Sequence, residues 1–426
     1  MLYIAMKYIQ KDSAESRDLL GRFLDYVKIC STSSSKNADN GKIPSTKEET
    51  EFATRLADDM KAAGLSGVLI TEYSYVYGFL DPSAGCSKVS PFCLLAHMDT
   101  VEEVCGKNVK PTVIRDYRGN TIPLGNGIVL DPKTDPALAR AGKELDTIIT
   151  TDGTTLLGAD DKAGIAVIMA AIQYISGHPE IKHGKIEVLF SPDEETGHGM
   201  DKVPINLISS KCGYTVDGGH IGELETECFN AFRSDITFTG RATHTGTARA
   251  GKMVNAVTMA GAFIAALPHR EAPETTDGYE GFYAPMEVTG SIEASHVTLF
   301  LRDFTSSGID RRRELVREIA QATAHSFGGT VEVIHSKQYL NMKQKLDEHP
   351  EVVQHLTTAF KKAGIEPLCL PIRGGTDGSR LTEMGIPTPN MFTGGHNYHS
   401  RTEWASLSQM CAAAEVIINL AAVVAT

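Results

Sequence analysis

The apolar residues of the chain follow two different spacings, and these predict helices and strands in alternation. Apolar positions recur at helical spacing in five segments, which predicts helices over 14–30, 46–64, 159–174, 351–364 and 406–424. Shorter apolar runs predict strands over 68–70, 76–80, 92–96, 186–190 and 213–216. Strands that alternate with helices are typical of an open α/β sheet, whose functional residues lie beyond the carboxyl ends of the strands.

The order of the predicted elements changes in the middle of the chain. There the pattern predicts a strand, a helix, two strands, a helix and a strand, over 233–239, 252–267, 282–289, 295–303, 306–327 and 330–335. This β-α-β-β-α-β order suits a ferredoxin-like domain. We therefore expect residues 223–339 to form a small α+β domain inserted into a larger α/β domain made of residues 1–222 and 340–426. The segment 100–152 is rich in glycine, proline and asparagine, and its elements are not assigned.

The composition is that of a globular protein large enough for two domains, with 426 residues, of which 42% are hydrophobic and 22% charged. A formal net charge of −12 disfavours nucleic acid or an anionic membrane as a partner. The eight cysteines are scattered without a CxxC pair, which predicts buried free thiols in a reducing compartment such as the cytoplasm. Residues 1–10 lack the apolar region of a signal peptide, and we expect no membrane-spanning helix.

Two adjacent carboxylates, Asp160 and Asp161, follow the apolar pair Leu156-Leu157 and a glycine, and they precede an apolar helix. This order predicts a strand-to-helix turn with the carboxylates at its mouth. An aspartate in this position often does no more than cap the helix. The alternative, a functional role, depends on what the rest of the chain places near the turn.

Acidic and imidazole residues follow apolar strands at four further places. His97 and Asp99 are two residues apart, so that they share a face of the strand, and the carboxylate can accept the second N–H of the imidazole. Glu194 and Glu195 are neighbours that point in opposite directions from an extended segment. Each motif alone has an ordinary explanation as a turn, a loop or a solvated surface. Together they supply two imidazoles and three carboxylates: His97, Asp160, Glu195, Asp217 and His399.

Nitrogen and oxygen donors in these numbers suit a pair of divalent cations that share one carboxylate. Zinc is the metal we predict, with manganese or cobalt as alternatives. The motifs also have a familiar order along the chain. They resemble the successive motifs of the M20 metallopeptidases, and most closely those of its cytosolic tripeptide aminopeptidases, in AHMDT at 96–100, LGADDKAG at 157–164, SPDEE at 191–195, TVDGG at 215–219, RGGTDG at 373–378 and GGHNYH at 394–399.

The resemblance implies a mixed-sheet α/β catalytic domain with an inserted lid domain, and it assigns the roles of the donors. The five residues above become the ligands of two zinc ions, with Asp160 shared between them and joined to Asp161 by a cis peptide bond. Glu194 becomes the general base that takes a proton from a metal-activated water, and Asp99 orients His97. His396 departs from the family pattern, because the family does not need a second histidine beside His399.

The lid domain contributes further residues by the same resemblance. His244 corresponds to a histidine that stabilises the tetrahedral intermediate, often from the partner subunit, so that a homodimer through the lid domain is expected. Arg302 and Arg373 match clamps for the free carboxylate of a peptide, with a structural ion pair as the alternative for either one. Asn255 is a weaker candidate for the same pocket.

These residues predict a dinuclear zinc aminopeptidase that releases the N-terminal residue from short peptides, in particular from tripeptides. A dipeptidase or an N-acyl-amino-acid deacylase of the same fold is the enzymatic alternative. A non-catalytic, two-lobed protein that binds peptides is the alternative from another class, although such a protein has no use for Glu194 beside a metal pair.

Overall fold

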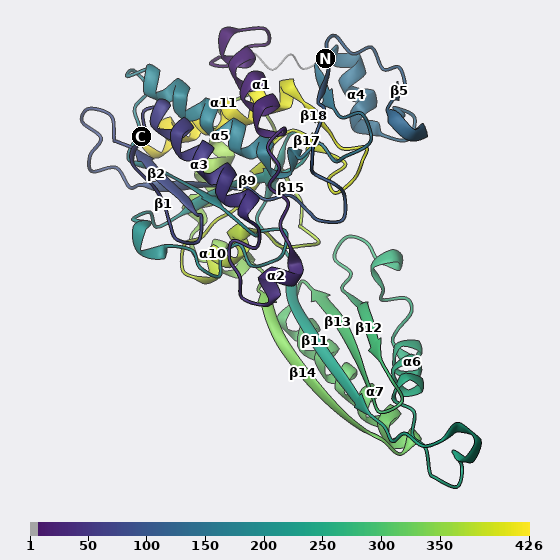
Figure 1. Cartoon of the computed structure of the whole chain (residues 1–426). Coiled ribbons are helices and arrows are strands. Elements are labelled where there is room, and N and C mark those ends of the chain that lie inside the picture. The colour runs from purple at the N-terminus through teal and green to yellow at the C-terminus, as the bar shows by residue number, and fades with distance from the viewer. Residues whose placement is uncertain (1–6) are drawn as a thin grey trace. The chain divides into compact units, whose positions relative to one another are not determined.

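The computed structural model of this chain describes residues 7–426, and it forms two compact units (Figure 1). The first unit runs to Thr226 and continues with Gln344–Leu370 and Thr376–Thr426, and the second contains Glu227–Lys343 and Pro371–Gly375. The second unit thus includes a short segment that was expected in the larger domain. Ile372 holds this segment in place, because its N–H donates to the carbonyl of Glu227 at 2.8 Å. Residues 1–6 lie outside the described residues, and the expectation about a signal peptide partly concerns them.

A mixed sheet of eight strands forms the centre of the first unit. Its order is β1-β2-β8-β3-β9-β16-β10-β15. The strands β8, β3, β9 and β16 run parallel to one another, β2 and β10 run against them, and this confirms the predicted mixed α/β class. The bounds are Ser66–Ile70 (β1), Val76–Leu80 (β2), Phe92–His97 (β3), Ile186–Ser191 (β8), Gly213–Gly218 (β9), Glu223–Glu225 (β10), Leu368–Cys369 (β15) and Asn390–Phe392 (β16).

Helices bury one face of this sheet in the main hydrophobic core. The central helix is α5, which is apolar on all sides and buried along most of its length, as expected of a helix with neighbours all round. The opposite face of the sheet carries a smaller core, in which Tyr75, Leu95 and Leu189 pack with Leu381 of α10. The helices of the unit are Ala14–Tyr26 (α1), Ser35–Asp39 (α2), Lys47–Ala62 (α3), Pro136–Glu144 (α4), Ala159–Gly177 (α5), Pro350–Lys362 (α9), Asp377–Glu383 (α10) and Leu407–Val424 (α11).

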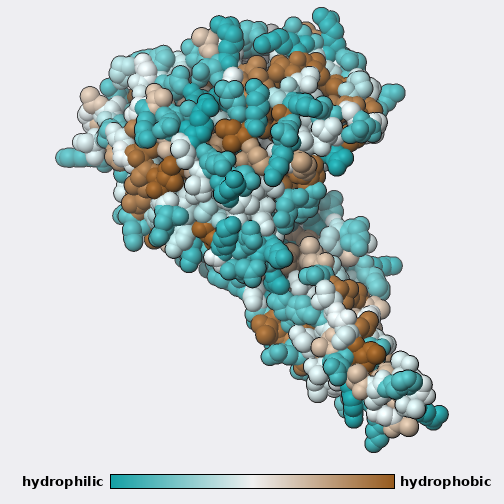
Figure 2. All heavy atoms as spheres, in the orientation of Figure 1, coloured by the Kyte–Doolittle hydropathy of each residue, from teal (hydrophilic) through white to brown (hydrophobic). Residues whose placement is uncertain are grey.

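The helix α11 is long and apolar enough to cross a membrane, contrary to the expectation that no segment would be. In this protein 83% of the helix Leu407–Val424 is buried inside the structure. Its apolar residues pack in the same hydrophobic core as α5 and α9. On the face shown in Figure 2, hydrophobic residues lie in separate groups among hydrophilic ones.

The unassigned segment after residue 100 contains several short elements whose positions the sequence pattern did not predict. They are Thr112–Ile114 (β4), Ile122–Pro123 (β5), Val129–Leu130 (β6) and Ile148–Thr150 (β7), together with α4. A second sheet joins two of these strands to distant parts of the chain in the order β17-β18-β7-β4, where β17 is Gly395–His396 and β18 is Trp404–Ser406. This sheet fixes both ends of the loop that carries His399.

The second unit is a four-stranded antiparallel sheet with two helices on one face (Figure 1). Its order β12-β13-β11-β14 is that of a ferredoxin-like fold, and α6 and α7 share a separate hydrophobic core with the sheet. The bounds are Asn230–Thr239 (β11), Ala256–Ala266 (α6), Phe282–Gly290 (β12), Ala294–Asp303 (β13), Ser306–Phe327 (α7) and Thr330–Tyr339 (β14). A short helix, Lys343–Glu348 (α8), follows and was not predicted.

Several local predictions differ from the structure, and two of them concern the N-terminal helix and the segment before α5. The first helix ends at Tyr26 instead of residue 30. Leu156-Leu157 is not part of a strand, and an irregular segment leads from β7 into α5. The backbone N–H groups of that segment therefore lack the partners that a sheet would give them.

Gly164 allows α5 to contact β9, and its substitution tests this packing. A Cβ atom there would overlap the carbonyl oxygen of Val216 and the carboxylate of Asp161. We expect Gly164→Ala to destabilise the first unit by at least about 2 kcal/mol, since overpacked cores are strained. Gly177 ends the same helix, and a Cβ atom added there would meet no atom of residues 7–426 within 4 Å. Gly177→Ala should change the stability by less than about 1 kcal/mol. Thermal unfolding of both variants measures the difference, and equal melting temperatures would contradict the packing argument.

Candidate metal centre

Three of the predicted ligands meet at the edge of the sheet where the parallel strands end. His97 is the last residue of β3, Asp217 lies near the end of the neighbouring strand β9, and Asp160 lies at the start of α5. The Nε2 atom of His97 is 2.9 Å from Oδ1 of Asp160 and 3.5 Å from Oδ1 of Asp217. We call these three residues the His97 group.

The two other predicted ligands approach the same aspartate from its opposite oxygen. Glu195 follows β8, and His399 lies in the loop between β17 and β18. The Nε2 atom of His399 is 3.2 Å from Oδ2 of Asp160 and 3.0 Å from Oε1 of Glu195. We call His399, Asp160 and Glu195 the His399 group. The structure thus brings all five predicted residues together within the first unit, with Asp160 shared by both groups.

Every predicted ligand was expected to follow a strand, and this is wrong for Asp160. Asp160 follows the irregular segment after β7, and its peptide bond to Asp161 is cis, as the resemblance implies. His399 lies in a loop and has a positive φ of 57°. Both residues depend on the second sheet for their positions. The strands of this sheet have only two or three residues, and strands this short produce little periodic signal in a sequence.

Asp99 is fully buried and contacts the cluster in two ways. Its Oδ1 atom is 3.4 Å from Nδ1 of His97, and its backbone carbonyl is 3.1 Å from the same nitrogen. Its two carboxylate oxygens also accept the backbone N–H groups of Glu194 and Glu195 at 3.0 and 3.1 Å. One carboxylate therefore fixes the backbone of both glutamates in addition to facing the imidazole.

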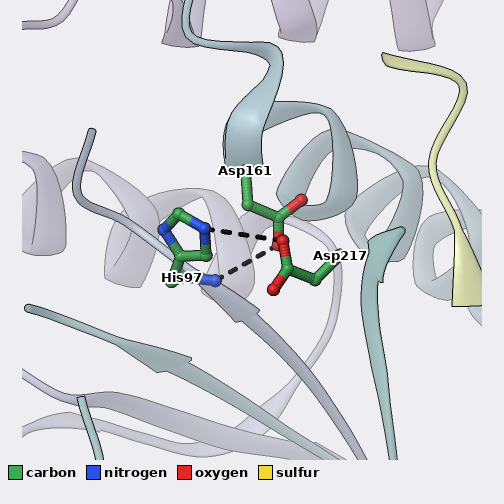
Figure 3. A group of neighbouring side chains, drawn as sticks. All are labelled: His97, Asp161 and Asp217. Atoms are coloured by element: carbon green, nitrogen blue, oxygen red, sulfur yellow. Dashed lines mark hydrogen bonds and ion pairs between the residues drawn. The ribbon is translucent and has the colours of Figure 1, made fainter. Parts of the chain in front are cut away.

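Asp161 also belongs to the cluster, although no role was predicted for it. Figure 3 shows its carboxylate beside that of Asp217, with His97 facing both. Asp161 accepts the backbone N–H of His97 at 3.3 Å and that of Gly164 at 3.1 Å. Both of its oxygens are thus engaged by the backbone, and Asp161 joins the start of α5 to the end of β3.

Burial and mutual repulsion shift the pKa values of these groups. Burial raises the pKa of Asp217 and that of Glu195 above their ordinary values. Burial alone would lower the pKa of His97, but Asp217 and Asp160 raise it well above the ordinary value of histidine. Hydrogen bonds to Asp160 and Glu195 raise the pKa of His399 in the same direction. The cluster thus carries an excess of acidic groups that favours positive charge between them.

Divalent cations fit this donor set. Each group offers one imidazole nitrogen and two carboxylates around a shared aspartate, and these are the ligand types that zinc accepts. Oε1 of Glu195 is buried and has no hydrogen-bond partner among the described residues, although His399 is close. Buried polar atoms without partners are costly, and a cation would supply the missing partner. Burial also raises the pKa of Glu194, the direction expected of a carboxylate that accepts a proton.

Four predicted residues lie in the second unit, outside this cluster. His244 is exposed, and its Nδ1 atom accepts the backbone N–H of Gly246 at 3.1 Å, which leaves Nε2 as the donor of the neutral imidazole. Asn255 caps α6, since its Oδ1 atom accepts the N–H groups of Val257 and Thr258. The hydrogen bonds of both residues are therefore local ones within the second unit.

The two predicted arginines, Arg302 and Arg373, donate mainly to carbonyl oxygens. Arg302 is 9% exposed, donates to the carbonyl oxygens of Leu301 and Phe232, and lies against the ring of Phe300. Arg373 donates to the carbonyl oxygens of Gly278, Glu280 and Thr276. Neither guanidinium pairs with a carboxylate within the described residues. Arg373 therefore holds the loop 276–280, while Arg302 keeps a buried positive charge without a carboxylate partner there.

His396, the departure noted in the sequence, has a structural explanation. Its ring stacks on Trp404 at a centroid distance of 4.0 Å and is 8% exposed. Burial lowers its pKa to about 4, so the imidazole is neutral near pH 7. His396 thus packs the short strand pair β17-β18 that holds the loop of His399.

The fold and the cluster together define a metal-dependent enzyme of the mixed α/β class. A model of peptidase family M20/M25/M40 matches residues 151–422. Peptidase T of Clostridium perfringens (strain 13 / Type A) is 44% identical over 402 residues, which are 94% of this chain and 97% of that protein. The chain belongs to the M20/M25/M40 peptidase family, as its motifs predicted.

Solved structures agree with this fold at lower sequence identity. Aminopeptidase PepT from Bacillus cereus ATCC 10987 superposes with a TM-score of 0.74 at 23% identity, over 96% of this chain and 99% of that one. The YXEP protein of Bacillus subtilis, described as a dinuclear metal-binding peptidase of the M20 family, has a TM-score of 0.65 at 13% identity, over 97% and 99%. The likeness to these two structures concerns the fold alone.

The burial of His396 predicts a pH-dependent contribution to stability. Its pKa is about 4 in the folded protein and near the ordinary 6.5 in the unfolded chain. Between these values the unfolded chain binds more protons, so the free energy of unfolding falls as the pH falls. His396→Phe keeps the stacked ring and removes this dependence. Between pH 7 and pH 5 we expect the melting temperature of the wild type to fall by more than that of the variant.

An exposed histidine serves as the control for this comparison. His325→Phe on α7 should keep the pH dependence of the wild type. Scanning calorimetry at both pH values measures the three proteins. Parallel losses in the wild type and in His396→Phe would contradict the proposed neutral, buried state of His396.

Proposed function

We propose that this chain is a two-metal aminopeptidase that removes the N-terminal residue from tripeptides. The observation that carries the proposal is the position of Asp160, whose two oxygens each face one imidazole, while Asp217 and Glu195 complete the two groups. The relative with 44% identity is called Peptidase T, and a solved structure of the same fold is called an aminopeptidase. Their names support a peptide as the substrate, and the donor atoms of the cluster support metal-dependent hydrolysis.

The proposed reaction uses zinc ions held by the His97 group and the His399 group. Bound there, divalent cations lower the pKa of a water molecule and polarise the carbonyl of the scissile peptide bond. Glu194 takes a proton from the attacking water and delivers it to the leaving amine. Asp99 keeps His97 oriented and accepts the backbone N–H groups of Glu194 and Glu195. The proposed base Glu194 and the proposed ligand Glu195 therefore keep fixed positions relative to His97.

The second unit contributes the remaining roles in this proposal. His244 donates from Nε2 to the developing oxyanion, which its hydrogen bond at Nδ1 supports. Arg302 receives the free carboxylate of the peptide, which is supported by its buried charge and by the lack of a carboxylate partner among the described residues. Arg373 and Asn255 contribute to the same recognition, although the contacts of Arg373 assign it mainly to its own loop.

The proposal extends to assembly and compartment. A homodimer through the second unit is supported by two exposed apolar residues on the edge strand β12, Met286 and Val288. A reducing compartment, the cytoplasm, is supported by the eight cysteines, which are all free. They are not all buried as predicted, because Cys105 and Cys369 are exposed.

Removal and return of metal test the function as a whole. We expect chelation to abolish hydrolysis of an unblocked tripeptide, and added Zn²⁺, Mn²⁺ or Co²⁺ to restore it, with two metal ions per chain by elemental analysis. Rates on dipeptides, tripeptides, tetrapeptides and N-acetylated peptides then identify the substrate. Activity confined to dipeptides or to acetylated substrates would replace the proposal by one of its enzymatic alternatives. Peptide binding without hydrolysis by the metal-loaded protein would replace it by the binding protein.

Glu194→Gln tests the assignment of the base. The amide cannot accept the proton of the water, so kcat should fall by about 10²- to 10⁴-fold while the metal content stays that of the wild type. Glu180→Gln, at an exposed glutamate, makes the same chemical change elsewhere and should keep full activity. Unchanged turnover in Glu194→Gln would exclude this role for Glu194.

A further inference from the structure

A buried glutamate outside the proposed ligand set accepts hydrogen bonds from the turn that carries Asp160. Glu403 is 1% exposed and lies four residues after His399. Its Oε2 atom accepts the backbone N–H groups of Leu157 and Gly158, both at 2.7 Å. Its Oε1 atom accepts the backbone N–H of Asp160 at 3.1 Å. Three donors therefore converge on one carboxylate.

The local backbone offers these three donors no acceptor of its own within residues 7–426. The segment before α5 is irregular, so no strand pairs with it, and the first N–H groups of a helix have no partner inside the helix. The capping residue of α5 is Gly158, with a φ of 80° and no side chain that could accept them. Buried N–H groups without a partner are costly, and Glu403 satisfies three of them.

The same loop contacts Asp160 from two directions. His399 faces its side-chain oxygen Oδ2, while Glu403 binds its backbone N–H. The second sheet anchors the loop, because Trp404 pairs with Thr150 of β7 and the hydroxyl of Thr150 donates to the carbonyl of Glu403 at 3.3 Å. A displacement of Glu403 would therefore change the distance between His399 and Asp160.

We propose that Glu403 is a positioning residue that sets Asp160 against His399 and so determines the metal affinity of the His399 group. This inference rests on the proposed function of the cluster. The His97 group depends on Glu403 less, because β3 and β9 hold His97 and Asp217 and because Asp161 joins α5 to β3 independently. The carboxylate of Glu403 binds backbone N–H groups, and it acts on the cluster through the backbone of the turn.

The amide variant Glu403→Gln isolates this role. A glutamine has nearly the same shape, but its NH₂ group must face either the N–H of Asp160 or the two N–H groups of Leu157 and Gly158. At least one hydrogen bond becomes a contact between two donors. We therefore expect the turn to move without a cavity in the core.

Glu415 provides a matched control in the same unit. It is also 1% exposed, and its carboxylate accepts three backbone N–H groups, those of Lys7, Tyr8 and Ile9, at 3.0, 2.8 and 3.1 Å. It lies on α11 and ties down the segment before α1 instead of the turn that carries Asp160. Glu415→Gln thus makes the same chemical change with the same number of hydrogen bonds.

The experiment compares zinc binding, by competition with a chromophoric chelator, with kcat and KM on a tripeptide and with the melting temperature of the metal-free protein. In Glu403→Gln we expect one zinc ion to bind as in the wild type and the other about 10- to 100-fold more weakly. At limiting zinc, kcat should fall while KM stays within about twofold, and excess zinc should restore kcat. Glu415→Gln should lose melting temperature and keep both zinc affinities.

The outcomes separate this inference from the proposed function. Wild-type zinc affinities in Glu403→Gln, or equal losses of zinc in both variants, would overturn the role of Glu403. A wild type that binds no zinc would instead overturn the proposed function. If Glu403→Gln does not fold, Glu403→Asp carries the test under the same criteria, because it keeps both acceptor oxygens and shortens the reach to the turn.

Discussion

The structure of the first unit depends on the burial of carboxylates at the edge where its parallel strands end. Asp160, Asp217 and Glu195 lie there with two imidazoles, and each would avoid this position without a positive partner. Divalent cations would meet that requirement, because they would neutralise the carboxylates and bind the imidazole nitrogens. The mixed sheet, the glycine that lets α5 contact β9, and the second sheet all serve to bring these five side chains to one place.

Carboxylates around the cluster also organise the backbone. Asp99 accepts two N–H groups from the segment after β8, Asp161 accepts two from β3 and α5, and Glu403 accepts three from the turn before α5. Irregular segments carry functional residues well only if their N–H groups are satisfied. In this protein, acidic side chains accept the hydrogen bonds of these N–H groups where no neighbouring strand does so. The negative charge of the region therefore has a structural cause as well as a functional one.

The two units use their charged residues differently. In the second unit Arg373 joins the segment 371–375 to the loop 276–280 through carbonyl oxygens, so the first half of the motif at 373–378 belongs to the smaller unit. Arg302 remains buried in the sheet between aromatic rings. The sequence shows that Arg302 and Arg373 are present. It does not show which hydrogen-bond acceptors the fold places beside them.

The sequence by itself determined the mixed α/β class, the long helices and strands, the ferredoxin-like order of the second unit and the identity of the clustered donors. Long amphipathic or apolar segments carry a strong periodic signal, and motifs such as HMD and DEE carry their chemistry in adjacent residues. Only the tertiary structure decided that Leu156-Leu157 is not a strand, that Asp161 and Glu403 hold the backbone, and that His396 packs on Trp404. The reason is physical: these roles arise from contacts between residues far apart in the chain, such as Glu403 and Asp160, and no local pattern encodes which distant N–H group a buried carboxylate meets.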